Sequence, residues 1–92
     1  MKTTVIHIRN APRGWQTDPL FVYIGRPSAW GNPYHISSTM TREEAITAYE
    51  RLHLLRFDPA KIRTALHEKI LVCYCKPKPC HGDVLARIAD TT

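Results

Sequence analysis

The chain has 92 residues, of which 43% are hydrophobic and 23% charged, and these proportions argue against an intrinsically disordered protein. No apolar run approaches the roughly 20 residues needed to cross a bilayer, and the N-terminus becomes polar too early for a signal peptide. We therefore expect a single α/β domain over residues 1–92, cytoplasmic and without a membrane partner. The net charge of +5 favours a nucleotide, a nucleic acid or another anionic ligand, although dispersed cations are also typical of an ordinary solvated surface.

Two strands are predicted in the first third of the chain. Residues 5–9 alternate between apolar and polar side chains, which predicts a first strand. After a turn at residues 10–14, residues 20–25 are almost continuously apolar, which predicts a second strand buried on both faces. Residues 25–34 then hold two glycines, two prolines and an asparagine, so we expect a shaped loop there.

That loop carries residue types that bind anionic and aromatic groups. Arg26 can hold an anion with its fork of donors, and Asn32 offers both a donor and an acceptor. Trp30 and Tyr34 offer faces for stacking, and Gly31 permits a close backbone approach. The alternative is that the two aromatic side chains anchor the loop to the core while Arg26 forms a structural ion pair.

Two helices are predicted before the third strand. Residues 41–44 form a capping box, and the helix that follows has an apolar stripe at three- and four-residue spacing. The stripe, which we expect to face the core, consists of Ala45, Ala48, Tyr49, Leu52 and Leu55. Asp58 followed by Pro59 predicts the start of a second, short helix. Its predicted core face carries Ile62, Ala65 and Leu66.

Residues 70–74 are predicted to form a buried third strand, and the spacing of Val84, Leu85 and Ile88 predicts a closing helix. The helices before the third strand are long enough for a crossover between parallel neighbours. The fold class is therefore expected to be α/β, with a mostly parallel sheet of three to four strands and helices packed on it. Because ligands bind beyond the carboxyl ends of such strands, the loops after the second and third strands should face one site.

The segment between the third strand and the closing helix predicts a metal site. Cys73, Cys75, Cys80 and His81 supply the soft ligands and the number of ligands that zinc prefers. Their C-x-C-x4-C-H spacing differs from the paired C-x-x-C of common zinc modules, and we expect the adjacent Cys80 and His81 to point in different directions. A set of three, Cys75 and Cys80 with one other residue, is simpler. An odd number of clustered cysteines in a reducing compartment argues against a disulfide framework.

The same segment also fits a reactive thiol. Cys80 lies where the closing helix begins, and the helix dipole and free amides there lower the pKa of a thiol. His81 could act as a base, and Asp83 could orient it or accept a proton. The alternatives are that Cys73 is simply a buried strand residue and that Asp83 only complements the helix dipole.

Two groups of motifs give the chain a resemblance to a known family. They are Gly-Arg at residues 25–26 with Gly-Asn-Pro at 31–33, and Cys-Tyr-Cys at 73–75 with Cys-His-Gly-Asp-Val-Leu at 80–85. With these motifs the chain resembles, over nearly its whole length, the domain-of-unknown-function family numbered 4326, small proteins of bacteria and bacteriophages. The resemblance also singles out Ser28, Pro33, Pro77 and Gly82. In general plan the chain looks like a compact relative of Rossmann-like nucleotide-binding domains.

We expect a small enzyme-like domain that acts on or binds a nucleotide or a nucleic-acid component. The expected ligand-binding residues are Arg26, Ser28, Trp30, Gly31, Asn32 and Tyr34, and the expected reactive or metal-holding centre comprises Cys75, Cys80 and His81. The alternative is a zinc-stabilised binding module for nucleic acid or a host protein. A third possibility is a small phage protein that inhibits a host factor.

Overall fold

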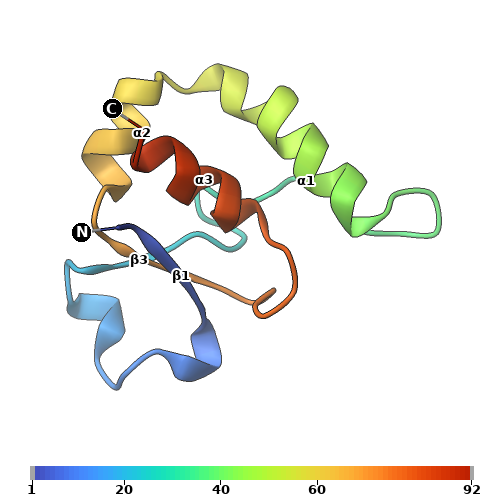
Figure 1. Cartoon of the computed structure of the whole chain (residues 1–92). Helices are drawn as coiled ribbons and strands as arrows, with labels where there is room; N and C mark the ends of the chain where they lie inside the picture. Colours follow the sequence, from blue (N-terminus) through green and yellow to red (C-terminus); the bar gives the residue numbers. More distant parts are fainter. Residues whose placement is uncertain (1, 92) are drawn as a thin grey trace.

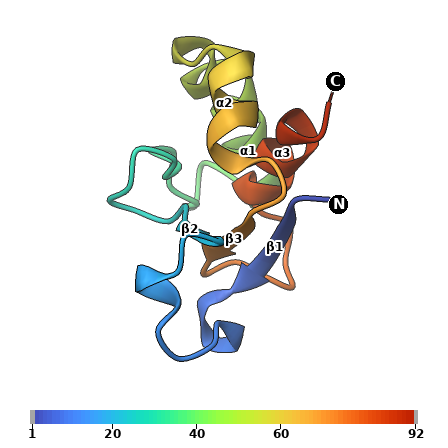
Figure 2. The ribbon, with the colours of Figure 1, turned by 90° about the vertical axis from the view of Figure 1, so that its left-hand side faces the viewer.

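The computed structural model describes residues 2–91 and has a three-stranded parallel sheet. The strands are β1 (Thr4–His7), β2 (Phe21–Tyr23) and β3 (Ile70–Cys73), in the order β1-β3-β2. They lie side by side in Figure 2, with β3 in the centre. The predicted small α/β fold with a parallel sheet is therefore confirmed.

The helices lie on one side of this sheet (Figures 1 and 2). They are α1 (Arg42–Arg51), the 3-10 helix η3 (His53–Arg56), α2 (Pro59–Leu66) and α3 (His81–Ala89). Two further 3-10 helices, η1 (Ile8–Asn10) and η2 (Trp15–Thr17), connect β1 to β2 on the other side. Among residues 2–91, no helix is long and apolar enough to span a membrane.

The core lies between the sheet and the helices. Its largest fully buried side chains include Ile24, Tyr49, Leu66, Leu71 and Leu85. The central strand β3 is almost fully buried, whereas β2 is only half-buried because it forms an edge of the sheet. The expectation that the second strand is buried on both faces was therefore wrong.

The apolar stripe of α1 also ends earlier than its spacing predicted. Leu52 and Leu55 are 56% and 78% exposed, because α1 ends at Arg51 and the chain continues in the tighter η3. A 3-10 helix has three residues per turn, which changes the side-chain phase and buries Leu54 instead. On α2, Ile62 and Leu66 face the core as predicted, whereas the predicted core residue Ala65 is exposed.

The predicted helix starts are correct. The Thr41 side chain accepts a hydrogen bond from the amide of Glu44 (3.1 Å), and the Glu44 carboxylate accepts one from the amide of Thr41 (2.9 Å). The Asp58 side chain accepts from the amide of Ala60 (2.9 Å) at the start of α2. Both starts satisfy amides that have no partner within their own helix.

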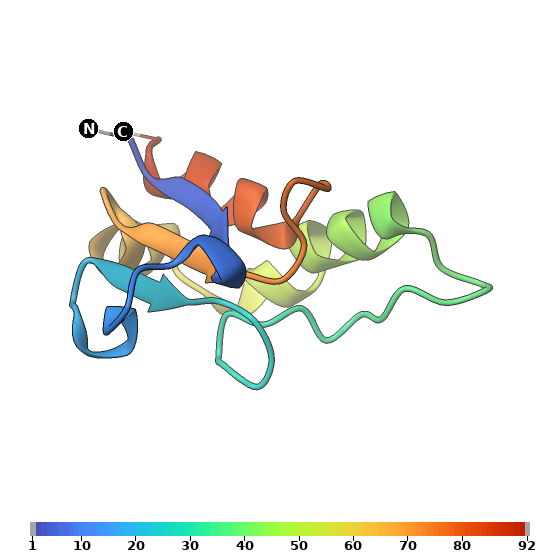
Figure 3. The ribbon, with the colours of Figure 1, turned by 90° about the horizontal axis from the view of Figure 1, so that it is seen from below.

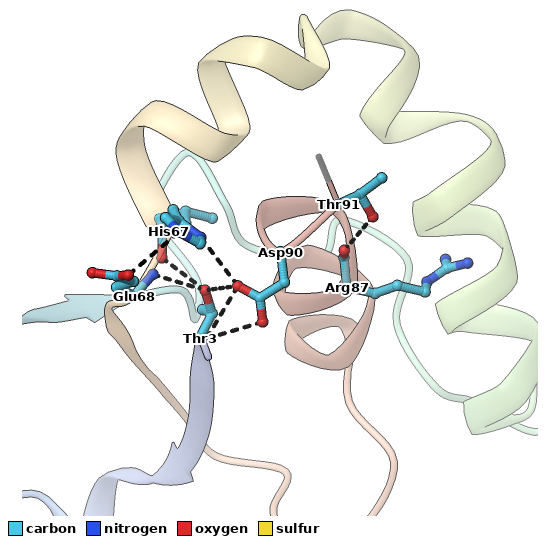
Figure 4. A network of polar contacts seen from close by, with 7 residues as sticks. Thr3, His67, Glu68, Arg87, Asp90 and Thr91 are labelled. Carbon is cyan, nitrogen blue, oxygen red and sulfur yellow. Dashed lines mark hydrogen bonds and ion pairs between the residues drawn. The ribbon is translucent and has the colours of Figure 1, made fainter. Parts of the chain in front are cut away.

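A polar network joins the beginning of β1 to the ends of α2 and α3 (Figure 4). The Asp90 carboxylate, just after α3, accepts hydrogen bonds from the Thr3 hydroxyl (2.7 Å) and the Thr3 amide (3.0 Å). It also accepts from Nδ1 of His67, just after α2 (3.2 Å). The Thr3 hydroxyl in turn accepts from the amide of Glu68 (3.0 Å). Segments far apart in sequence are therefore linked at this end of the molecule.

The opposite end of the sheet positions the site. Residues Phe21–Tyr23 of β2 pair in parallel register with Ile70–Val72 of β3. The loops after both strands consequently leave the sheet at the same edge, as the sequence predicted. The extended segment between β2 and α1 also begins there (Figure 3).

Candidate ligand and metal site at the sheet edge

The loops after β2 and β3 border one cavity at the carboxyl edge of the sheet. Its volume is about 410 Å³, which lies within the roughly 300–1,000 Å³ typical of small-molecule sites. The wall is formed by the ends of both strands, the loops that follow them, and residues of α1 and α3. The site therefore lies where ligands bind in open α/β sheets.

Two arginines line this cavity. Arg26 follows β2, and its guanidinium contacts the imidazole of His35. Arg42 opens α1 and donates a hydrogen bond from Nη1 to the carbonyl of Pro79 (3.2 Å). Within residues 2–91, neither guanidinium pairs with a carboxylate and no Asp or Glu lines the cavity. The wall is therefore cationic, and the alternative of a structural ion pair for Arg26 is not what the structure shows.

Tyrosines form the aromatic part of the wall. Tyr23, Tyr34 and Tyr74 all line the cavity. The Tyr23 and Tyr74 rings meet edge to face with centroids 6.3 Å apart, and Tyr74 remains 63% exposed. The Tyr23 hydroxyl donates to the carbonyl of Arg26 (2.8 Å), which ties the start of the loop to the end of β2. Stacking surfaces and a cationic group are thus held next to each other.

Asn32 holds the loop in place through its side-chain amide. Its Nδ2 donates to the carbonyl of Ala45 in α1 (3.1 Å), and its Oδ1 accepts from the backbone amide of Tyr34 (2.9 Å). The loop is thereby attached to α1. This attachment sets the position at which Arg26 and Tyr34 reach the cavity wall.

Cys75, Cys80 and His81 come together on the same wall. Their ligand atoms, Sγ, Sγ and a ring nitrogen, all lie within 4.8 Å of one another, so these three residues could hold a metal ion. Cys75 lies in the loop after β3, Cys80 is the N-cap of α3, and His81 is its first residue. Because the N-cap has extended backbone (φ −141°, ψ 149°), Cys80 and His81 do not follow helical spacing. Their Sγ and Nδ1 atoms are 3.6 Å apart, and the expectation that they diverge was wrong.

The hydrogen bonds of His81 determine which ring nitrogen faces the thiols. Nε2 lies 2.8 Å from the carbonyl of Ile24, which can only accept, so Nε2 carries the proton. Burial lowers the pKa of His81, so the imidazole is neutral near pH 7. Nδ1 therefore presents its lone pair toward Cys80, and the Tyr49 ring packs against the imidazole edge to face (4.9 Å).

Cys73 and Cys80 form a buried thiol pair. A hydrogen bond from the Cys80 thiol lowers the pKa of Cys73 to about 6. The same bond, together with burial, raises the pKa of Cys80, although its Sγ also accepts from the amide of Gly82 (3.3 Å). Cys73 is fully buried at the end of β3 and does not line the cavity.

Asp83 acts in the cap of α3 rather than in the cavity wall. Its Oδ2 accepts from the amide of Cys80 (3.1 Å), and its Oδ1 forms an ion pair with Nζ of Lys76 (2.5 Å). Asp83 does not line the cavity. Its carboxylate fixes the backbone of Cys80, and Lys76 ties the preceding loop to the same turn.

The predicted ligand-binding residues divide into two groups. Arg26, Asn32 and Tyr34 line the cavity. Trp30 instead stacks on Phe57, with centroids 5.1 Å apart, and its carbonyl accepts from the hydroxyl of Tyr49 (2.6 Å). Three predicted residues, Ser28, Trp30 and Gly31, lie outside the cavity wall.

The sequence analysis did not predict several other residues of the cavity wall as site residues, chiefly Tyr23, Arg42 and Tyr74. Tyr23 ends β2 and Tyr74 directly follows β3, so their place at the carboxyl ends of parallel strands was a usable signal. Arg42 carried no such signal, because a charged residue in the first turn of a helix is usually part of a solvated face.

Together these features define a small α/β protein with a cationic cavity and a Cys/His group at the carboxyl edge of its sheet. The chain belongs to the family described as Domain of unknown function (DUF4326), whose model matches residues 6–91, so the predicted resemblance is confirmed. It is similar to the "Uncharacterized 12.4 kDa protein in nrdA-td intergenic region" of Enterobacteria phage T4. The identity is 38% over 73 residues, which cover 75% of this chain and 67% of the phage protein. No solved structure matches.

Proposed function

We propose that this chain is an enzyme-like domain that binds a small anionic ligand with an aromatic ring, of the nucleotide class, in the cavity at the sheet edge. The observation that carries the proposal is the charge of the wall. Arg26 and Arg42 line a cavity without carboxylates, and neither is paired with one among the described residues. Guanidinium groups match the geometry of phosphate oxygens and bind them with charge-assisted hydrogen bonds.

The size and the aromatic lining support the same ligand class. A cavity of about 410 Å³ can hold a ligand the size of a mononucleotide. Tyr34 and the exposed Tyr74 offer ring faces on which a base can stack, and stacking is worth about 1–3 kcal/mol per base. Trp30 is not part of this proposal, because its ring is already stacked on Phe57.

Cys75, Cys80 and His81 are the reactive or metal-holding residues of the domain in this function. They line the cavity together, so a ligand held by the arginines lies beside two thiols and an imidazole. Asp83 supports them indirectly, because it fixes the Cys80 backbone.

A binding assay with an arginine variant tests the proposal. Isothermal titration calorimetry with AMP, GMP, CMP and UMP should give saturable binding, and Arg26→Ala should weaken it roughly tenfold or more, since a charge-assisted hydrogen bond is lost. The matched control is Arg13→Ala, an exposed arginine outside the cavity wall that changes the net charge equally. Absence of binding at millimolar nucleotide, or equal weakening by both substitutions, would reject the proposal.

A second candidate function is a zinc-stabilised binding module for nucleic acid or a host protein. The convergence of Cys75, Cys80 and His81 favours it, because a metal there would join the loop after β3 to the start of α3. In that case the metal serves the fold, and the basic surface makes the contact with the partner.

A further inference from the structure

The Cys75, Cys80 and His81 group has the ligand chemistry of a zinc site. Two thiolates and one imidazole are soft and borderline ligands, which zinc prefers over the oxygen ligands of magnesium or calcium. The three ligand atoms lie within 4.8 Å of one another. Small adjustments of the side chains therefore suffice to place all three around one ion.

A hydrogen bond outside the ligand set orients the imidazole. Nε2 of His81 donates to the Ile24 carbonyl (2.8 Å), which leaves Nδ1, the atom on the thiol side, free to bind the ion. Metal-bound histidines usually donate their other ring N–H to a carbonyl or carboxylate in this way, and the bond fixes both tautomer and ring orientation. Ile24 directly follows β2 and is fully buried, so this support belongs to the core.

Among residues 2–91, the cavity wall supplies three ligands and no fourth. Within the described part of the chain, no further Cys, His, Asp or Glu lines the cavity, and Cys73 does not belong to the group. Cys73 is fully buried at the end of β3 and lies outside the cavity wall. Zinc is tetrahedral, and sites with three protein ligands keep the fourth position open for water or substrate. Since all three ligands line the cavity, the open position faces into it.

We propose that Cys75, Cys80 and Nδ1 of His81 hold a zinc ion whose fourth position faces the cavity and takes a phosphate oxygen of the bound ligand. This inference rests on the proposed function, since the phosphate belongs to the same nucleotide-class ligand. Charge supports the assignment: zinc with two thiolates is neutral, so the negative charge of the phosphate is left for Arg26 and Arg42. The ion positions the phosphate, and the arginines neutralise it.

Cobalt substitution tests the inference without relying on activity. Metal-free protein titrated with Co²⁺ should bind one ion per chain and develop the visible d–d band of tetrahedral cobalt with thiolate ligands. Inorganic phosphate and AMP should each shift that band, AMP at a lower concentration because its base stacks on tyrosine. Cys75→Ser should weaken cobalt binding at least about tenfold, whereas the control Cys73→Ala should keep the stoichiometry and the band.

The outcomes separate this inference from the proposed function. AMP that binds by calorimetry without shifting the cobalt band would overturn the inference and leave the proposed function standing. Cobalt binding that Cys73→Ala abolishes as strongly as Cys75→Ser would also overturn it, since the site would then be a closed one. Arg26→Ala should raise the AMP concentration needed for the shift while leaving cobalt binding unchanged. Circular dichroism of each variant confirms that it is folded.

Discussion

At the scale of single residues, the site depends on close backbone contacts as much as on reactive groups. Gly82 follows the candidate ligands Cys80 and His81 and lies in the first turn of α3, close to Val5 of β1 and to Ile24. A Cβ at this position would lie 2.6 Å from Cδ1 of Ile24 and 2.9 Å from Cγ1 of Val5. The glycine therefore lets the first turn of α3 approach the sheet closely enough for His81 to reach the Ile24 carbonyl.

Gly82→Ala should lower the free energy of unfolding. Overpacking costs about 1–3 kcal/mol. The gain in helix propensity is smaller than the roughly 1 kcal/mol of a helix interior, because Gly82 lies in the first turn of α3. The measurement is urea denaturation of the wild type and the variant. Ile24→Val removes the Cδ1 atom with which the new Cβ would clash. The double variant should therefore lose less stability than the sum of the losses in the two single variants. Purely additive costs in the double variant would show that this contact is not the cause.

At the scale of elements, the junction between β3 and α3 is the part of the chain that brings the site together. Its loop, residues 74–80, is held by the cap of Asp83 on Cys80 and by the ion pair of Asp83 with Lys76. Both interactions are partly exposed, so the junction has less support than the buried strand before it. A metal bound by Cys75, Cys80 and His81 would add a third tie between loop and helix.

Metal removal should therefore affect this junction first. At a zinc concentration about 100 times its dissociation constant, the folded state should gain about 2.7 kcal/mol, because the ion binds only the folded protein. Chelation should reverse this gain, which thermal denaturation measures, and hydrogen exchange should accelerate in residues 74–83 more than in α1. Magnesium serves as the control ion. Equal stability and equal exchange with and without zinc would contradict a metal at the junction.

At the scale of the whole molecule, the network around Asp90 connects the two ends of the described chain. Hydrogen bonds to Thr3 and His67 tie β1, α2 and α3 together at the end of the sheet opposite the site (Figure 4). Desolvation by burial alone would raise the pKa of Asp90, but the hydrogen bonds from Thr3 and the contact with His67 outweigh it and lower the pKa below 3.8. The folded state thus favours the ionised carboxylate.

This shift makes part of the stability dependent on pH. A carboxyl whose pKa is lowered by folding contributes stability above its unfolded pKa, and the contribution is lost as pH falls through the folded value. The unfolding free energy of the wild type should exceed that of Asp90→Asn, and this excess should shrink as the pH falls below about 4. Urea denaturation at each pH measures the difference. In a Thr3→Val background the difference should be smaller, and an unchanged difference there would assign the effect to another partner.

Local sequence chemistry was sufficient to predict the three strands and the three α-helices, but not the 3-10 helices. The capping box at residues 41–44, the Asp58–Pro59 helix start and the apolar run of β3 each depend on neighbours within a few residues. The parallel pairing of β2 and β3 also followed from the sequence, because a crossover of that length connects parallel strands. With it came the prediction that Arg26 and the cysteine segment lie at one sheet edge.

Only the tertiary structure decided which of the candidate residues meet. Trp30 turned to the core because Phe57 lies beside it, and Arg42 reached the cavity because α1 packs next to the loop after β3. Cys80 and His81 converge because the first is an N-cap with extended backbone, a detail that spacing along the sequence does not contain. Residue types and the succession of elements along the chain are local properties, whereas the direction of a side chain depends on contacts between segments distant in sequence.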